Sequence, residues 1–266
     1  MENKGIDVSS FQGTPDLVKL KAAGYSFVII KAGQGMREMA TFKERYLPAV
    51  QAAGLEWGAY WWTDAETVAE AKQEAQACLK ALAGLKPTYP VWLDQEYTSP
   101  CGNAWGVGYG KQLRTDMAKA FMQILQDAGY YTGLYASQDW LDNWVDKSQL
   151  TDFDKWVAQY ASKCTYVGSY GIWQNDVIGK KGVKGKDYQT YGLVPGLIEN
   201  CDVDIAYIDY PSIIKTAGLN GWGKQAPTVP AEEMVPKVEL DAVAAERDAA
   251  ISKYVALVSS IKALVG

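Results

Sequence analysis

The segment KLKAAGYSFVIIKA, residues 19–32, joins the end of an amphipathic helix to an apolar strand through Gly24. The same order recurs in AVQAAGLEWGAYWWT (49–63) and QILQDAGYYTGLYAS (123–137), with Gly54 and Gly129 at the junctions. Glycine just after a helix permits the left-handed conformation that ends it. Strands that are apolar on both faces fit a parallel sheet covered by helices. These segments therefore predict alternating helices and parallel strands.

The rest of the chain continues this alternation over about 210 residues. The expected helices are 14–23, 41–53, 64–84, 108–128 and 138–146, and the further strands are 5–9, 155–161, 170–175 and 202–208. This order is typical of a closed (β/α) barrel of the TIM type or of a doubly wound sheet. No G-x-G-x-x-G motif follows the first strand, so we favour the barrel. Fewer helices separate the later strands, which predicts an α/β barrel that is irregular in its second half.

The composition changes after Gly223, where KQAPTVPAEEMVP contains three prolines and no apolar period. We predict a barrel over residues 1–218, a linker over 219–237 and a C-terminal helix over 238–266. Apolar residues recur at spacings of three and four from Leu240 to Leu264, which is a heptad pattern. We expect this helix to form homo-oligomers through a short coiled coil. The alternatives are that it folds back on its own domain or is the stem of a lost module.

The length, composition and net charge of the chain exclude several classes of protein. The chain has 266 residues, 48% of them hydrophobic, with a net charge of −5 and a pI near 5.0, which argues against nucleic acid as a partner. No apolar run reaches the ~18 residues of a membrane helix, and the first residues lack a secretory signal. We therefore expect cytoplasmic synthesis, no membrane partner, and free thiols at the four cysteines.

The chain contains no histidine. Ser-His-Asp and Cys-His catalysis and histidine-containing zinc sites are therefore excluded. Acid–base chemistry must use carboxylates, lysine or tyrosine.

Carboxylates gather at predicted strands. The apolar strand in YPVWLDQE (89–96) ends with Asp94 and Glu96, whose i, i+2 spacing directs both side chains to one face. Asp7 lies in GIDVS, and Asp202 and Asp204 lie in CDVDIAY. Our boundaries place Asp7 and Asp202 near the starts of their strands. Closure of the barrel would nevertheless make the first and eighth strands neighbours.

Mutual repulsion and burial would keep one such acid protonated beside ionised partners, as glycoside hydrolysis requires. The competing chemistry is a Mg²⁺ or Ca²⁺ site built from carboxylate oxygens. Aromatic residues favour the sugar over the metal, since the chain has ten tryptophans and 17 tyrosines. Those expected near the acids are Trp57, Tyr60, Trp61, Trp62, Tyr135 and Trp173. At most one of Trp61 and Trp62 can face the groove, because neighbouring side chains in a strand alternate.

Seven stretches together resemble the muramidases of glycoside hydrolase family 25. They are GIDVSSFQG (5–13), FVIIKAGQG (27–35), GAYWW (58–62), VWLDQE (91–96), GLYAS (133–137), GIWQND (171–176) and CDVDIAYIDYP (201–211). They run in family order over about four-fifths of the chain, and the D-x-E motif between GIDVS and DVD is the most specific. The resemblance implies an irregular (β/α) barrel that uses no cofactor and no metal.

The resemblance also assigns roles. Glu96 is expected to be the general acid, Asp94 to orient or stabilise the 2-acetamido group, and Asp7 and Asp202 to be the other acids of the cleft. The expected substrate-binding residues are Lys31, Tyr60, Trp62, Tyr135, Trp173, Gln174 and Asp204. Many relatives have asparagine at the position of Asp204, and the GQG after Lys31–Ala32 departs from the usual T-E-G.

The implied reaction is cleavage of the β-1,4 bond between N-acetylmuramic acid and N-acetylglucosamine in bacterial peptidoglycan. We expect a phage endolysin, made in the host cytoplasm and released by a holin. Two alternatives are a non-catalytic wall-binding module on the same barrel and an interaction protein that works through the C-terminal helix.

Overall fold

The computed structural model describes residues 2–102, 109–178, 196 and 201–223. The predicted C-terminal helix and most of the predicted linker lie outside the described residues, as do the expected coiled coil and the oligomer built on it.

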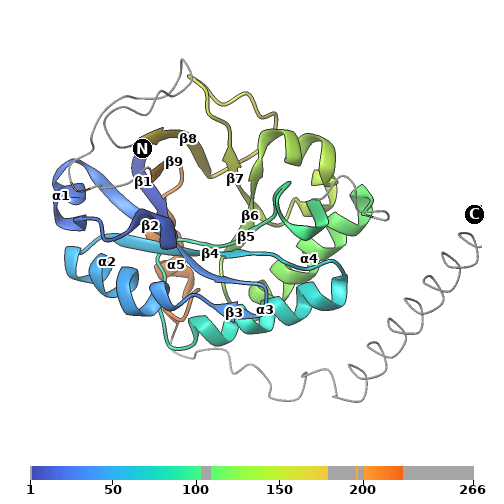
Figure 1. Cartoon of the computed structure of the whole chain (residues 1–266), viewed down its shortest axis with the longest axis horizontal. Coiled ribbons are helices and arrows are strands. Elements are labelled where there is room, and N and C mark those ends of the chain that lie inside the picture. The colour runs from blue at the N-terminus through green and yellow to red at the C-terminus, as the bar shows by residue number, and fades with distance from the viewer. Residues whose placement is uncertain (1, 103–108, 179–195, 197–200, 224–266) are drawn as a thin grey trace, which may run out of the picture. The chain divides into compact units, whose positions relative to one another are not determined.

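Eight strands form a closed barrel (Figure 1). In chain order the strands are β1 (Asn3–Val8), β2 (Tyr25–Gln34), β3 (Arg37–Glu38), β4 (Glu56–Trp62), β5 (Val91–Asp94), β6 (Thr132–Ser137), β7 (Asp154–Ala158), β8 (Ile172–Ile178) and β9 (Cys201–Ala206). The barrel closes because β1 pairs with both β2 and β9, while the short β3 adds to β2 outside the ring. The predicted barrel is confirmed, and the doubly wound sheet is excluded.

The neighbouring strands of the barrel run parallel except around β9. This strand is antiparallel to both β8 and β1. The start of β9 therefore lies at the same end of the barrel as the C-terminal ends of the parallel strands. That end carries the carboxylates described below.

The helices follow the expected positions within a few residues in the first half. They are α1 (Leu17–Ala22), α2 (Leu47–Ala53), α3 (Val68–Leu82), α4 (Lys111–Asp127) and α5 (Tyr210–Ala217). The helix expected over 138–146 is a short π-helix, η4 (Trp140–Trp144), followed by the 3-10 helix η5 (Lys147–Leu150) before β7, and these short elements confirm the irregular second half. The sequence analysis missed α5, whose N-cap Asp209 accepts a hydrogen bond from the Ser212 N–H.

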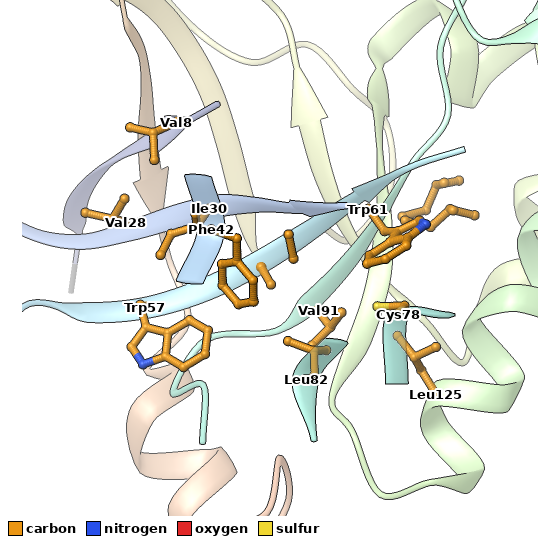
Figure 2. Packing of buried hydrophobic residues seen from close by; sticks show 14 of the residues in the cluster. Val8, Val28, Ile30, Phe42, Trp57, Trp61, Cys78, Leu82, Val91 and Leu125 are labelled. Atoms are coloured by element: carbon orange, nitrogen blue, oxygen red, sulfur yellow. The ribbon is translucent and has the colours of Figure 1, made fainter. Parts of the chain in front are cut away.

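Side chains that point out of the barrel form the larger apolar core. Val8, Val28, Ile30 and Val91 lie on the outer face of their strands, where they join helix residues such as Leu82 (Figure 2). The expected amphipathic helices cover this face and remove apolar area from water.

At the end of the barrel opposite the carboxylates, which is called the lower end, the inward-pointing side chains are mostly aromatic. They include Phe27, Tyr89, Trp92 and Trp156, with Tyr210 and Ile214 of α5 packed against them. Glycine makes room for these rings: a Cβ on Gly5 would lie 2.3 Å from the Phe27 ring, and one on Gly133 would lie 2.5 Å from Trp92. The rings and α5 fill the lower barrel, so an open pocket can exist only near the other end.

The barrel body extends beyond the boundary expected at residue 218. Asn220 is fully buried, accepts from the Tyr131 N–H at 2.8 Å, and donates to the carbonyls of Pro87 at 3.1 Å and Tyr89 at 3.0 Å. Residues 219–223 therefore belong to the barrel, and the linker cannot begin at residue 219. These three hydrogen bonds depend on tertiary contacts, which explains why local composition did not reveal them.

The four cysteines are free thiols, as expected. No helix within the described ranges has the length and apolar character needed to cross a membrane.

Candidate active site

Strand direction brings four acids to one end of the barrel. Asp7 is the fifth of six residues in β1, so it lies near the end of its strand and not near its start as expected. Asp202 is the second residue of β9, but β9 runs in the opposite direction, which places it beside Asp7. Asp94 ends β5, and Glu96 follows two residues later. All four acids expected to be catalytic therefore meet at this end.

The four acids line one pocket with a volume of about 220 Å³. Its walls also contain the expected residues Lys31, Tyr60, Trp62, Tyr135 and Gln174. Ser9, Phe11, Gln12 and Trp156 complete the lining and were not predicted. The pocket therefore combines carboxylates with aromatic surfaces, which suits a ligand that has both hydroxyl groups and apolar faces.

Asp94 and Glu96 form a close pair with unequal exposure. Asp94 is only 3% exposed, and its Oδ1 has no hydrogen-bond partner among the described residues. Burial, followed by the charge of Glu96, raises the pKa of Asp94 well above its usual value. Burial also raises the pKa of Glu96, although hydrogen bonds from Tyr135 and Thr98 oppose the rise. This pair therefore tends to retain a proton at a pH where free carboxyl groups are ionised.

The loop after β5 holds Glu96 in place. The Glu96 backbone N–H donates to Ser99 Oγ at 3.2 Å, and the Ser99 carbonyl accepts from the Gly102 N–H at 2.8 Å. A Cβ on Gly102 would lie 2.1 Å from the Glu96 carbonyl oxygen, so only glycine fits against this turn. Glu96 remains only partly buried and faces the pocket.

Asp7 and Asp202 are directly opposite one another in the antiparallel β1–β9 pair. Residues paired in this way have Cβ atoms roughly 4.5–5.5 Å apart. Burial raises the pKa of Asp7 well above its usual value, and the charges of Asp202 and then Asp204 add to the effect. Burial also raises the pKa of Asp202, while a hydrogen bond from the Tyr160 hydroxyl at 2.8 Å lowers it. Three acids so close together cannot all be ionised without a large cost.

Gln174 links Asp7 to the opposite wall. Its Nε2 donates to Asp7 Oδ2 at 2.8 Å. Its Oε1 accepts from the hydroxyls of Tyr135 at 2.9 Å and Tyr160 at 3.2 Å. The amide nitrogen faces Asp7 because an N–H can donate to the carboxylate, whereas each tyrosine hydroxyl shares its single proton between Gln174 Oε1 and a carboxylate, Glu96 for Tyr135 and Asp202 for Tyr160. Gln174 therefore positions Asp7 and lowers its pKa.

Lys31 is the positively charged residue in the pocket lining. Its Nζ lies 4.9 Å from the centre of the Trp62 ring and donates to Gln34 Oε1 at 3.0 Å. Gln34 in turn donates to Asp64 at 3.1 Å. Burial lowers the pKa of Lys31, and the nearby carboxylates, Asp94 first, partly restore it. The ammonium group thus lies where it can both contact a ligand and lower the pKa values of Asp94 and Glu96.

Two expected binding residues lie outside the pocket lining. Trp173 points away from the barrel interior because it neighbours the inward-facing Gln174, and its indole N–H donates to the Gln159 carbonyl at 2.8 Å. Asp204 points inward but lies one layer below Asp202, fully buried, where Oδ1 accepts from Trp156 Nε1 at 2.8 Å. Trp61 is also buried on the outer face, so only Trp62 of that pair lines the pocket, as alternation requires.

The site residues missed by the sequence analysis were present in stretches that it used. Ser9, Phe11 and Gln12 lie in GIDVSSFQG, and Trp156 and Tyr160 lie in the predicted strand KWVAQYA. Tyr160 falls after the end of β7, where it reaches Asp202 and Gln174. None of the four acids lies on β7, so alternation along this strand could not be counted from them, although Trp156 and Ala158 share its inner face.

Metal-ligating side chains do not cluster in the described part of the chain. No group of three or more cysteine, aspartate or glutamate residues there has an arrangement that could hold a metal ion.

Comparison with known proteins gives a consistent family. The family model described as "Glycosyl hydrolases family 25" matches residues 6–181. An autolytic lysozyme of Clostridium acetobutylicum is 26% identical over 203 residues, which cover 76% of this chain and 55% of that protein. The chain therefore spans about half the length of this curated relative.

Two solved structures share the fold. The modular autolysin LytC of Streptococcus pneumoniae, in complex with a synthetic peptidoglycan ligand, superposes with a TM-score of 0.63 at 19% identity, covering 77% of this chain and 47% of that one. The catalytic domain of endolysin ply40, from bacteriophage P40 of Listeria monocytogenes, gives a TM-score of 0.62 at 19% identity, with coverage of 81% and 98%. At these identities the structures establish similarity of fold.

Proposed function

The chain belongs to glycosyl hydrolase family 25, and from this we propose that it is a muramidase that cleaves the β-1,4 bond between N-acetylmuramic acid and N-acetylglucosamine in bacterial peptidoglycan. The observation that carries the proposal is the pocket in which Glu96 and Asp94 face Asp7 and Asp202 among aromatic walls. The peptidoglycan ligand of the LytC structure supports the choice of substrate.

Glu96 is the proton donor in this proposal. Burial favours its neutral form, and its partial exposure to the pocket allows it to reach a glycosidic oxygen, which the more deeply buried Asp94 does less readily. Protonation of the leaving oxygen lets the glycosidic bond break as positive charge develops at the anomeric carbon; water later adds its hydroxyl to that carbon and returns a proton to Glu96. The carboxylate left on Glu96 then lies near Lys31, whose charge stabilises it.

Asp94 interacts with the 2-acetamido group of the sugar at the cleavage point. Asp94 lines the pocket beside Glu96, so its carboxylate is positioned to accept the acetamido N–H. This bond would turn the acetamido oxygen towards the anomeric carbon, where it can stabilise the developing charge. Asp7 and Asp202 contribute further negative charge on the opposite side of the pocket.

The identity of the cleaved bond can be tested by mass spectrometry of digested peptidoglycan. After borohydride reduction, a muramidase leaves products that end in reduced N-acetylmuramic acid. Products that end in reduced N-acetylglucosamine would refute the proposed bond. Binding to cell walls without release of reducing ends would instead support the non-catalytic wall-binding module.

The role of Glu96 can be tested with Glu96→Gln. This variant keeps the shape of the side chain but cannot donate the proton, so the rate should fall roughly 10²–10⁴-fold. Glu44→Gln, at an exposed position outside the pocket lining, is the matched control. Equal turbidity-clearing rates for the two folded variants would overturn the assignment.

We also propose that the enzyme acts as an endolysin. The fold shared with endolysin ply40 supports this role. Expression in a susceptible bacterium should cause lysis only when a pore-forming membrane protein is expressed with it. Lysis without the pore would contradict the proposal.

Self-association through residues 238–266 is a further proposal, based on the heptad pattern from Leu240 to Leu264. Light scattering should give a multiple of the monomer mass for the full chain and the monomer mass after deletion of residues 225–266. A monomeric full chain would refute it.

A further inference from the structure

Phe11 is an exposed aromatic residue at the edge of the pocket. Its side chain is 82% exposed, yet it contributes to the pocket lining together with the catalytic acids. The ring makes no contact with another ring or with a cation in the part of the chain that the structure describes. An apolar ring in this position covers no core, so its contribution to folding is small.

The turn that carries Phe11 is held firmly. Within η1 (Ser10–Gln12) and its cap, the Phe11 N–H donates to Ser9 Oγ at 3.4 Å, and the Ser9 N–H donates to Gln12 Oε1 at 2.7 Å. The buried Tyr46 hydroxyl donates to the Ser9 carbonyl at 2.6 Å from below. Gly13, with φ of 64°, lets the chain leave the turn in the left-handed region. These hydrogen bonds hold the backbone of the turn in place, and the turn thereby holds the Phe11 ring at the edge of the pocket.

The other aromatic surfaces of the pocket are already engaged. Tyr60, Tyr135 and Trp156 are buried and pack against one another. Lys31 lies over the Trp62 ring. Phe11 is thus the most exposed aromatic residue of the lining, and its ring is open to a ligand.

The size of the pocket indicates which part of a ligand meets Phe11. About 220 Å³ is less than the roughly 300–1,000 Å³ of pockets that enclose drug-sized ligands. This volume suits a single sugar ring beside the acids. The next sugar of a glycan must then lie outside the pocket, at the edge where Phe11 is exposed.

We propose that Phe11 forms a binding subsite for the neighbouring sugar, stacking its ring against the apolar C–H face of an N-acetylated hexose. The inference rests on the proposed muramidase function and extends it to the recognition of glycan length. Polar sugar edges remain in water while the C–H face is covered, so the subsite accepts one sugar without deep burial. Phe11 therefore contributes to affinity for extended glycans and not to the chemical step.

The test measures glycan binding in the full chain carrying Glu96→Gln, which removes turnover. Titration calorimetry with peptidoglycan tetrasaccharide and with the monosaccharide N-acetylmuramic acid compares Phe11→Ala, Phe11→Leu, Phe11→Trp and the control Val167→Ala. Val167 is also 82% exposed but does not line the pocket. Phe11→Ala and Phe11→Leu should bind the tetrasaccharide about tenfold more weakly, with Phe11→Trp and Val167→Ala unchanged.

Further readouts distinguish stacking on Phe11 from a change in the fold or in the acidic pocket. The monosaccharide should bind all variants alike because it occupies the pocket alone, and the melting temperatures should agree because Phe11 covers no core. Wild-type tetrasaccharide affinity in Phe11→Ala or Phe11→Leu, or an equal loss for the monosaccharide, would overturn the subsite. Products from the enzyme with Glu96 intact test the proposed bond independently, so a failed subsite leaves the muramidase assignment standing.

Discussion

Replacing Asp204 with asparagine should make the protein more stable at neutral pH. Asp204 is fully buried, and its Oδ2 has no hydrogen-bond partner among the described residues. Burial, and then the charge of Asp202, raises its pKa well above the usual value. Asparagine has the same shape and can still accept the hydrogen bond from Trp156 Nε1, which is 2.8 Å long in the wild type.

The sign and size of the effect follow from proton binding. Between the pKa of the unfolded chain, about 3.9, and the higher pKa of the folded chain, only the folded chain holds this proton. The unfolding free energy of the wild type therefore falls by about 1.4 kcal/mol for each pH unit in this window. Asparagine at this position cannot titrate, so two pH units inside the window should separate the variants by roughly 2.7 kcal/mol. That difference is a large part of the free energy of unfolding of a typical protein, which is about 5–15 kcal/mol.

Urea unfolding, followed by tryptophan fluorescence from about pH 3 upwards, measures this difference on both sides of the unfolded pKa. The two stability curves should meet below the unfolded pKa and diverge as the pH rises. Asp146→Asn is a control of opposite sign, since hydrogen bonds from Ser148 and Gln149 lower the pKa of this exposed carboxyl. It should lose stability at neutral pH and none in acid. Parallel curves for the wild type and Asp204→Asn would refute the reasoning.

Three other variants test the site and its support. Lys31→Met removes the cation that lowers the pKa of Glu96, so the alkaline limb of the kcat/KM profile should move to higher pH; an unmoved limb would contradict this. Gln174→Leu removes the donor to Asp7, so the pKa of Asp7 rises and activity should fall by about tenfold or more, with circular dichroism unchanged. Asn220→Ala leaves a buried N–H and two carbonyls without their hydrogen-bond partner. Chemical unfolding should therefore show a free energy of unfolding lower by about 2–4 kcal/mol, while kcat of the folded enzyme stays the same.

The barrel could be predicted because its evidence is local. Each helix–glycine–strand junction, such as the one at Gly24, carries its own signal, and alternation along β5 correctly directed Asp94 and Glu96 to one side. The direction of β9 has no such local signal, because strand pairing is decided between residues far apart in the chain. This explains why no sequence pattern accounted for the location of Asp202 at the start of a strand, although the structure places it in the pocket. Helix α5 was missed although Asp209 and Pro211 form a usable start signal.

The filled lower barrel and the acidic pocket depend on each other. Trp156 packs among the aromatic side chains below the pocket and also donates to Asp204, so one residue connects the apolar interior with the acid cluster. The apolar layer keeps water from the carboxylates, and this raises the pKa values of Asp7 and Asp94. An acid that remains protonated near neutral pH requires such an environment, and the same environment makes the folded chain less stable as the pH rises. The burial that allows an acid to keep its proton for transfer is therefore expected to lower the stability of the folded chain as well. Asp204→Asn measures the effect on stability, and Glu96→Gln measures the effect on proton transfer.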